Sequence, residues 1–246
     1  MNIAVLGGTG LIGSQVVKIL TAAGHEATPL APSSGVDLLT GEGLDGALKG
    51  ADVVVNLTNS PTFDDASPAF FQTTMDNMLA AAKRDGVGHA VILSIVGVDQ
   101  VPELAYYRAK VLQEKLLETG PVPYSIVRAT QFFEFIPSVL TWTADDKTVR
   151  LPATPVQPMA SADISQAVAD VIVGKPLNGI RNLGGPEVFT LDELGRIILQ
   201  ARGDKREVVI DNTAGMFAAA PGDVLTAPAD AILSTTTFRE WLATQK

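Results

Sequence analysis

A glycine-rich loop near the start of the chain is the feature that most limits its possible folds. Residues 7–13 read GGTGLIG, which satisfies both the G-x-G-x-x-G and the G-x-x-G-x-x-G spacing. The loop follows the apolar, β-branched segment Asn2–Leu6, which predicts a buried strand, and precedes Leu11–Ala23, whose apolar spacing predicts an amphipathic helix. In this context the glycines indicate a βαβ unit that binds phosphates, because glycine allows a tight turn and the close approach of an anion to the backbone.

The loop is expected to hold the pyrophosphate of a dinucleotide. A P-loop for nucleoside triphosphates is excluded, because Ser14 stands where such a loop needs lysine. The free N–H groups at the start of the following helix are the expected phosphate donors. The expected dinucleotide contacts of the loop are Gly7, Thr9, Gly10, Leu11 and Ile12.

The choice between NAD and NADP is expected to depend on the end of the second strand, where residues 30–34 read LAPSS. A carboxylate at this place would bind both ribose hydroxyls and favour NAD. The chain has none there, and the hydroxyls of Ser33 and Ser34 can bond a 2′-phosphate. These residues favour NADP, with NAD as the alternative, since no arginine is present to hold the phosphate.

Short apolar strands alternate with helical patterns through the first half of the chain. After the glycine loop we expect strands at Glu26–Leu30, Ala51–Leu57, Ala90–Val96 and Tyr124–Arg128, and helices at Phe70–Arg84 and Leu104–Thr119. This alternation predicts right-handed βαβ crossovers. The expected fold class is therefore α/β, a Rossmann-like, doubly wound parallel sheet with helices on both faces.

The alternation weakens after about residue 129, where prolines separate shorter elements. Helices are still expected at Asp163–Val173, Leu191–Ala201 and Thr237–Ala243. The last two begin with a capping box, Thr-x-x-Glu, at Thr190 and Thr237. We therefore divide the chain into a dinucleotide-binding core, residues 1–129, and a smaller C-terminal substrate-binding lobe, residues 130–246, which shares a core with it.

Composition excludes several classes of function. The 246 residues include no cysteine and two histidines, so disulfides and thiolate metal sites are excluded and no metal is expected. A formal net charge of −9 argues against nucleic acid as a partner. The chain shows neither a signal peptide nor the roughly 20 apolar residues of a membrane span. We expect a cytoplasmic protein that binds a small-molecule substrate; its oligomeric state is left open.

A Tyr-x-x-x-Lys pair in the expected helix Leu104–Thr119 indicates the chemistry. Tyr106 and Lys110 are four residues apart and project from one helix face, whereas Tyr107 lacks this spacing. An ammonium beside a phenol lowers the phenol pKa, which lets it exchange a proton with a carbonyl or alcohol, and Lys110 can also bond a nicotinamide ribose. Ser94 lies 12 residues before Tyr106, at the end of an expected strand, where its hydroxyl can hold the substrate oxygen. The candidate catalytic residues are Ser94, Tyr106 and Lys110.

Six segments spread over the chain carry a family resemblance: GGTGLIG, ADVVVNLT, GVGHAVILSIVG, YYRAK, PYSIVRATQFFEF and LGGPEVFTLDEL. In these segments the chain resembles the short-chain dehydrogenase/reductase superfamily, and most closely its atypical, NmrA-like branch of NAD(P)-binding proteins. The resemblance implies that the segment after the Tyr-Lys helix passes the nicotinamide and that a loop in the first half borders the middle of the cofactor. The residues implied are Ala129, Thr130 and Gln131 in the first segment and Thr58, Asn59 and Ser60 in the second.

Large apolar side chains in the second half are candidate walls of a substrate pocket. They are Phe132, Phe133, Trp142 and Met159. A mostly apolar pocket suits a carbonyl compound or a quinone-like ring. Aromatic residues at helical spacing also occur in ordinary cores, so both interpretations stay open.

Together these patterns predict an NAD(P)-dependent oxidoreductase that transfers a hydride between nicotinamide and a small carbonyl, alcohol or quinone-like substrate. Tyr106 would be the acid/base, Lys110 its electrostatic partner and Ser94 the holder of the substrate oxygen. Two alternatives remain: a non-catalytic redox sensor that binds NAD(P), and an epimerase or isomerase that retains its cofactor. The chain contains neither G-x-S-x-G nor H-E-x-x-H, which argues against a hydrolase.

Overall fold

The computed structural model describes residues 1–245, which form two compact units that alternate along the chain. The first unit contains residues 1–94, 105–128 and 164–181. The second contains residues 95–104 and 129–163 and the chain from residue 182 onward. The sequence-based division after residue 129 stays a prediction, because compactness alone does not show which part would fold by itself.

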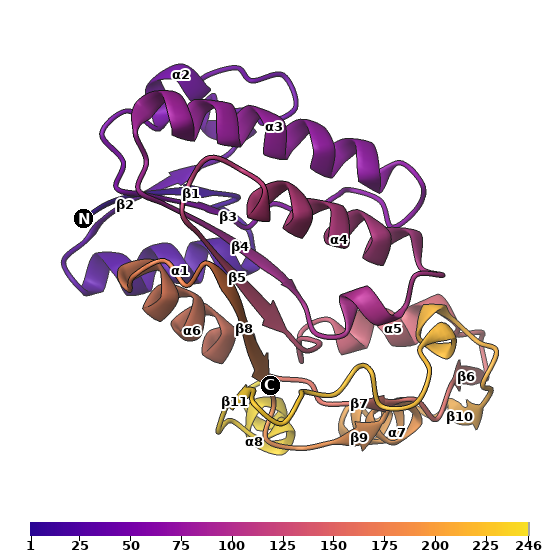
Figure 1. Cartoon of the computed structure of the whole chain (residues 1–246). Helices are drawn as coiled ribbons and strands as arrows, with labels where there is room; N and C mark the ends of the chain where they lie inside the picture. The colour runs from indigo at the N-terminus through magenta and orange to yellow at the C-terminus, as the bar shows by residue number, and fades with distance from the viewer. Residues whose placement is uncertain (246) are drawn as a thin grey trace. The chain divides into compact units, whose positions relative to one another are not determined.

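A parallel sheet forms the centre of the fold (Figure 1). Its seven strands lie in the order β2-β1-β3-β4-β5-β8-β11, and β1 pairs in parallel with both β2 and β3. At the far edge, the short β11 pairs in parallel with the last two residues of β8. The strands are β1 (Asn2–Leu6), β2 (Glu26–Leu30), β3 (Val53–Asn56), β4 (His89–Ile95), β5 (Tyr124–Ala129), β8 (Gly179–Gly184) and β11 (Ile232–Leu233).

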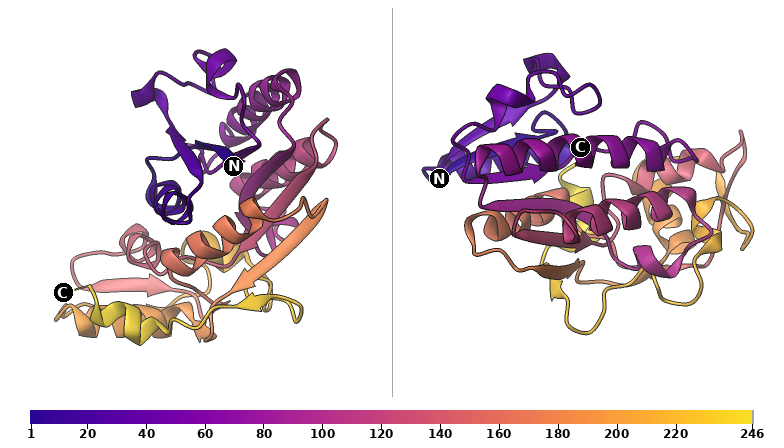
Figure 2. Two further views of the ribbon diagram at one scale, coloured as in Figure 1. Left: turned by 90° about the vertical axis from the view of Figure 1, so that its left-hand side faces the viewer. Right: turned by 45° about the horizontal axis from the view of Figure 1, so that its top comes forward.

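Helices cover both faces of the sheet in the first unit. Figure 1 shows α1 and α6 on one face and α3 and α4 on the other, and α3 and α4 lie side by side in Figure 2 as well. Among residues 1–245 no helix is both long and apolar enough to cross a membrane. The helices are α1 (Leu11–Ala22), the short α2 (Leu44–Ala47), α3 (Ser67–Asp85), α4 (Ala105–Glu118) and α6 (Ser161–Val173).

The central strands are apolar on both faces because helices pack on each side. All four residues of β3 are buried, and so are four of the five in β1. From one face of the sheet, Met75 and Met78 of α3 and Leu117 of α4 join the same core. The predicted Rossmann-like, doubly wound α/β fold is confirmed, and β1 and β2 have the predicted bounds.

The second unit contains shorter elements. Strand β6 (Thr148–Leu151) pairs in parallel with β10 (Glu207–Ile210), and β7 (Pro155–Val156) pairs antiparallel with β9 (Phe189–Thr190). Its helices are α5 (Ile136–Trp142), α7 (Leu191–Ala201) and α8 (Phe238–Ala243). Both predicted capping boxes are confirmed, since Thr190 and Thr237 are the N-caps of α7 and α8.

The strand order reverses at β1, and this reversal positions the candidate site. Helix α1 follows β1 on one face of the sheet, whereas α3 follows β3 on the other (Figure 1). The loops after these two neighbouring strands therefore run to opposite faces at the carboxyl edge of the sheet. In open α/β sheets such a switch point is where ligands bind.

Candidate active site and dinucleotide-binding loop

The glycine loop turns sharply between β1 and α1. Gly7 has a φ of +75°, a conformation that glycine adopts without strain, and its N–H donates to the Leu30 carbonyl at 2.9 Å. A Cβ at Gly7 would lie 2.9 Å from the carbonyl carbon of Leu57, directly after β3. The loop therefore packs closely against the segment on the other side of the switch point.

Gly10 and Gly13 differ in how closely a Cβ at each position would approach neighbouring atoms. A Cβ at Gly13 would stand 2.1 Å from the Gly7 carbonyl oxygen, so the approach of α1 to the loop requires glycine. At Gly10 the same oxygen is 3.3 Å away, and Gly10 is exposed with an ordinary φ of −76°. Packing thus explains Gly13 but not Gly10, and the backbone at the start of α1 stays open to an anion. The other predicted loop contacts are the exposed Thr9 and Leu11 and the buried Ile12.

The two serines after β2 lie on a short 3₁₀ helix, η1 (Pro32–Ser34), and differ in their bonding. Ser34 Oγ accepts from the Ala31 N–H at 2.9 Å and donates to the Ala31 carbonyl at 2.8 Å. Its hydroxyl proton is therefore used inside the turn. Ser33 is exposed. The hydrogen bonds with Ala31 are made by Ser34, so Ser33 is the better placed of the two to bind a ligand.

The segment after β3 is held by its own hydroxyl groups. Thr58 Oγ1 donates to Asn56 Oδ1 at 2.6 Å, and Ser60 Oγ lies 3.1 Å from Ser67 Oγ on α3. Asn59, between them, is exposed and reaches α4. The structure therefore brings this predicted cofactor-binding segment to the same strand edge as the glycine loop.

Tyr106 lies in the first turn of α4 with its side chain held on several sides. It is 8% exposed, and its phenol donates a hydrogen bond to Asn59 Oδ1 at 2.5 Å. The ring meets Phe63 edge-on with the centroids 4.8 Å apart, and Phe71 at 6.2 Å. These contacts fix both the ring and its hydroxyl group.

The pKa of Tyr106 is higher than its usual value, whereas the sequence predicted a lower one. Burial raises it to about 12, and the hydrogen bond with Asn59 opposes this only in part. The expectation that Lys110 lowers the pKa of Tyr106 is therefore wrong for this structure, because the Lys110 ammonium has other partners. Burial also raises the pKa of the neighbouring Tyr107.

Lys110 is buried and anchored to the end of β4. Its Nζ donates to the Leu93 carbonyl at 2.7 Å and to Gln113 Oε1, and it lies 5.0 Å from the centroid of the Phe71 ring. Burial lowers the pKa of Lys110 to about 8, while the negative charge of Glu114 acts in the other direction. The ammonium thus joins α4 to the strand that carries Ser94.

The low pKa of Lys110 predicts a specific dependence of stability on pH. The unfolded chain, with a lysine pKa of 10.5, binds this proton more tightly than the folded chain, with about 8. Lys110 therefore adds a contribution to the free energy of unfolding that increases as the pH rises from about 8 to 10.5. Below pH 8 this contribution is lost. In Lys110→Met this contribution is absent, so urea denaturation between the two pH values should give a flatter profile than for the wild type. Equal slopes would contradict the burial of a charged Lys110.

Ser94 is buried beside the carbonyl that Lys110 binds. It is 3% exposed, and its Oγ has no hydrogen-bond partner within residues 1–245. A buried hydroxyl without a partner is unusual in a folded protein and is satisfied when a polar ligand atom binds to it. The structure thus brings the end of β4, with Ser94, next to the face of α4 that carries Tyr106 and Lys110.

The three candidates from the last residue of β5 onward lie in the second unit and differ in their free polar groups. The Ala129 carbonyl accepts from the Val96 N–H at 3.0 Å, and Thr130 Oγ1 donates to the Gln157 carbonyl at 2.6 Å. Gln131 is buried, and in the described part of the chain neither atom of its side-chain amide has a partner. Of the three, Gln131 is the residue whose side chain could bond a ligand.

The predicted pocket walls also lie in the second unit, and two of them belong to its interior. Phe133 is fully buried and packs on Trp241, with the ring centroids 5.4 Å apart. Met159 is 1% exposed and forms a β-bridge with Phe132. Trp142, by contrast, is 45% exposed. A substrate-binding role for these four residues stays a prediction.

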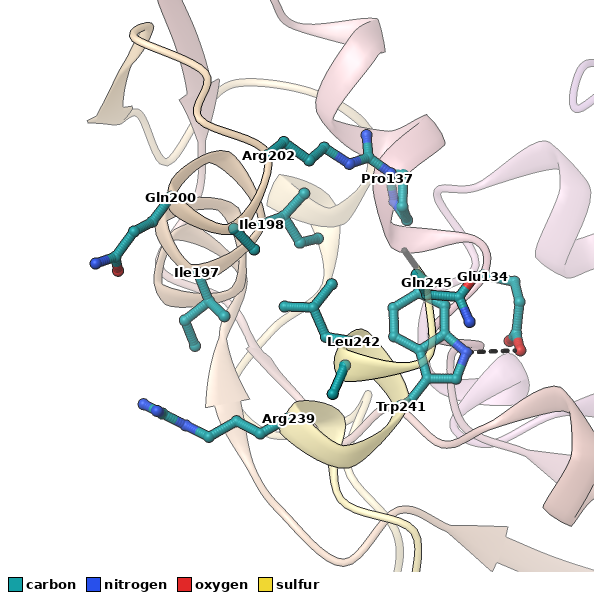
Figure 3. Close-up of a pocket in the computed structure, with 12 residues that line it drawn as sticks. Glu134, Pro137, Ile197, Ile198, Gln200, Arg202, Arg239, Trp241, Leu242 and Gln245 are labelled. Carbon is teal, nitrogen blue, oxygen red and sulfur yellow. Dashed lines mark hydrogen bonds between the residues drawn. The ribbon is translucent and has the colours of Figure 1, made fainter.

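An open groove of about 820 Å³ lies in the second unit. It is lined by α7, α8, the start of α5 and the segment before α5, as Figure 3 shows. Ile198 and Leu242 contribute apolar surface to it. The carboxylate of Glu134 at its side accepts from the indole N–H of Trp241 at 3.1 Å and from Ser161 Oγ at 2.7 Å. None of the predicted site residues lines this groove, and its carboxylate is engaged in structural hydrogen bonds.

Comparison with known families fits this geometry. A family model described as NAD(P)H-binding matches residues 7–174. The chain belongs to the NAD(P)H-binding family. The match includes the glycine loop and all three candidate catalytic residues, and the resemblance is confirmed at the level of the NAD(P)-binding superfamily. Its NmrA-like branch stays a prediction.

This NAD(P)H-binding chain is similar to curated reductases. It is 29% identical to the chloroplastic divinyl chlorophyllide a 8-vinyl-reductase of Cucumis sativus, over 82% of this chain but only 57% of that protein. It is 26% identical to a (4-alkanoyl-5-oxo-2,5-dihydrofuran-3-yl)methyl phosphate reductase of Streptomyces griseus, over 78% of this chain and 70% of that one. The Bordetella bronchiseptica enzyme WbmH, solved in complex with NAD+, shares the fold: the TM-score is 0.74 at 15% identity, with 98% and 96% of the two chains covered.

The residues present fit a nicotinamide dinucleotide at the switch point. The open backbone at Gly10 suits the pyrophosphate, and the buried, unpartnered Ser94 Oγ suits a polar ligand atom. In this NAD(P)H-binding domain, Gly7, Thr9, Gly10, Leu11 and Ile12 would hold the pyrophosphate.

The different surroundings of Gly10 and Gly13 predict that their alanine variants separate binding from folding. Gly13→Ala forces a Cβ onto the Gly7 carbonyl, so we expect a loss of about 1–3 kcal/mol in the free energy of unfolding. Gly10→Ala meets no such clash, and its stability should change by less than about 1 kcal/mol while dinucleotide affinity falls at least roughly tenfold. Urea denaturation and titration of NADPH fluorescence measure the two effects. A stable Gly13→Ala or a fully binding Gly10→Ala would contradict the assignment.

Two contacts of the site were absent from the sequence-based interpretation. Gln113 is fully buried and binds Lys110; it lies three residues further along α4, a spacing at which helix side chains meet. That signal could have identified it. Asn59 was placed near the cofactor by the family resemblance alone, and its bond with Tyr106 spans 47 residues. No local pattern indicates such a contact.

Proposed function

We propose that the chain is an NAD(P)-dependent oxidoreductase of the NmrA-like branch of the short-chain dehydrogenase/reductase superfamily, with a small carbonyl, alcohol or quinone-like substrate. The observation that supports it most is the anchoring of Lys110 to the strand end that carries Ser94, one helical turn from Tyr106. Two of the curated proteins to which the chain is similar are named reductases. Their names support the class of reaction, and the substrate is part of the proposal.

In the proposed mechanism the protein transfers one proton between Tyr106 and the substrate oxygen. Bound NAD(P) would supply or accept the hydride. Ser94 Oγ donates to the substrate oxygen and orients it, and Tyr106 transfers its hydroxyl proton to that oxygen as negative charge develops there. Lys110 binds the Leu93 carbonyl and so holds the strand end that carries Ser94 against the helix that carries Tyr106, which lets the two hydroxyl groups meet one substrate oxygen. In the reverse direction the same phenolate removes the proton from an alcohol.

NADP is the proposed cofactor of choice. The turn after β2 has no carboxylate that would repel a 2′-phosphate, and the exposed Ser33 can donate a hydrogen bond to one. Fluorescence titrations should give a lower Kd for NADPH than for NADH. Ser33→Ala should weaken NADPH alone, whereas equal weakening of both would contradict a contact with the 2′-phosphate.

The proposed function is tested by turnover. Purified protein is incubated with NADPH or NADH and a panel of aldehydes, ketones and quinones, and the absorbance of the reduced nicotinamide is followed. Steady consumption that depends on substrate supports the oxidoreductase. Tight binding of the dinucleotide with no turnover across the panel would instead favour a redox sensor. A sugar substrate that is isomerised without net change in absorbance would favour an epimerase.

A further inference from the structure

The contact between Tyr106 and Asn59 raises a chemical question for a proton donor. The phenol carries one proton, and in this structure that proton is directed at Asn59 Oδ1, 2.5 Å away. A phenol that donates to a substrate oxygen cannot donate to Asn59 at the same time. Some change at Asn59 must therefore accompany the transfer of the proton.

The side chain of asparagine is able to make this change. Its amide carries an acceptor, Oδ1, and a donor, Nδ2, on the same carbon, and rotation about the Cβ–Cγ bond exchanges them. Asn59 is exposed, so solvent can bond whichever group is turned away from the phenol. The ring of Tyr106 need not move, because Phe63 and Phe71 hold it.

The Lys110 ammonium, which lies one helical turn from Tyr106, makes its hydrogen bonds with other groups. Lys110 Nζ donates to the Leu93 carbonyl and to Gln113, so the hydrogen bond that Tyr106 makes is with Asn59. Tyr107 is the neighbouring tyrosine, and its pKa is raised by burial and by the charge of Tyr106. Asn59 is thus the polar side chain best placed to respond to the state of the phenol.

We infer that Asn59 is a positioning residue for Tyr106, which accepts from the phenol at rest and donates Nδ2–H to the phenolate after proton transfer. This inference rests on the proposed function. In the step, the Tyr106 O–H bond breaks, a bond forms between the proton and the substrate oxygen, and the electron pair stays on Tyr106 Oη. The hydride that reduces the substrate comes from the reduced nicotinamide dinucleotide of the proposed reaction. Asn59 neither gains nor loses a proton.

The test measures the phenol directly and needs no substrate. The protein contains three tyrosines, so 3-fluorotyrosine gives three ¹⁹F signals, and Tyr106→Phe identifies the one from residue 106. Fluorine lowers the phenol pKa, which brings the titration into a range where the protein stays folded. The pKa of this signal is compared in the wild type, Asn59→Ala and Asn59→Asp. Asn77→Ala is the matched control, because Asn77 on α3 binds the Leu38 carbonyl at 2.8 Å and not Tyr106.

In Asn59→Ala the phenolate loses a donor, so we expect the pKa of the residue-106 phenol to rise by about half a pH unit or more. In Asn59→Asp a carboxylate replaces the amide, and the rise should exceed about one unit. Asn77→Ala should leave the value unchanged. Unchanged titrations in both Asn59 variants, with folding confirmed by circular dichroism, would overturn the inference.

Turnover separates this inference from the proposed function. With a substrate that the wild type reduces, Asn59→Ala should lower kcat at least about tenfold with little change in KM, and the pH limb of kcat should move with the phenol pKa. A shifted pKa with unchanged kcat would overturn the positioning role. If the wild type reduces nothing, the proposed function fails and proton transfer fails with it, whereas the ¹⁹F titration still shows whether Asn59 binds the phenol.

Discussion

Replacing Tyr106 with phenylalanine is expected to lower kcat by about 10²- to 10⁴-fold and to leave dinucleotide affinity almost unchanged. The phenol is the proton donor of the proposed reaction, and Phe keeps the ring that packs against Phe63 and Phe71. The site should therefore keep its shape while losing its acid. Steady-state kinetics with NADPH, together with a fluorescence titration of the cofactor, measures the two quantities separately.

Tyr107→Phe is the matched control for this prediction. Tyr107 is adjacent in sequence and also buried, but it lacks the i, i+4 relation to Lys110. Its loss should change kcat by less than about threefold. Activity that survives in Tyr106→Phe and disappears in Tyr107→Phe would reassign the acid to the neighbouring residue.

The first half of the fold was predictable because each strand carries its own signal. Asn2–Leu6 forms β1 with the predicted bounds, since it is an apolar run that a glycine follows and that the parallel sheet buries. Glu26–Leu30 forms β2 with the predicted bounds although only Leu30 of it is buried. Helix α3 starts at Ser67, earlier than the predicted Phe70. The three added residues include Pro68, a residue that suits a first helical turn and gives no apolar periodicity.

The second half was less predictable because its elements are short. Pro137 is one of the prolines that follow residue 129, yet it lies in the first turn of α5, where its missing N–H costs nothing. Strand β8 has the sequence GIRNLG, which lacks both an apolar run and regular alternation. Such a strand is stabilised by its neighbours in the sheet, and a single-sequence pattern does not contain that information.

The candidate site was predictable where it depends on local spacing. The i, i+4 relation placed Tyr106 and Lys110 on one helix, and the strand end placed Ser94 beside them. The direction of the Lys110 ammonium was not predictable, because the Leu93 carbonyl competes with Tyr106 for it. The sign of the Tyr106 pKa shift followed from burial, which depends on tertiary packing.

Removing the carboxylate of Glu114 is expected to have the largest effect on stability. Glu114 on α4 and Arg128 on β5 form a two-point ion pair: Arg128 Nε donates to Oε1 at 2.9 Å and the terminal guanidinium nitrogen to Oε2 at 2.6 Å. The side chains are only 5% and 13% exposed. Glu114→Leu removes the carboxylate from both hydrogen bonds of this largely buried ion pair, and breaking such a pair costs about 3–5 kcal/mol in the free energy of unfolding. For a chain of this length even about 3 kcal/mol lowers Tm by roughly 6–12 °C.

Two further variants distinguish the loss of the ion pair from a simple loss of packing. In the double variant Glu114→Leu, Arg128→Leu no charge remains, so most of the lost stability should return. Asp65→Asn breaks the exposed pair between Asp65 and Arg108, at 3.3 Å, and should cost less than about 1 kcal/mol. Glu114→Leu should also lower the pKa of Lys110 further, because the charge of Glu114 raises it. If the single and double variants are equally unstable in urea, the cost lies in packing, and the buried ion pair does not account for the link between α4 and β5.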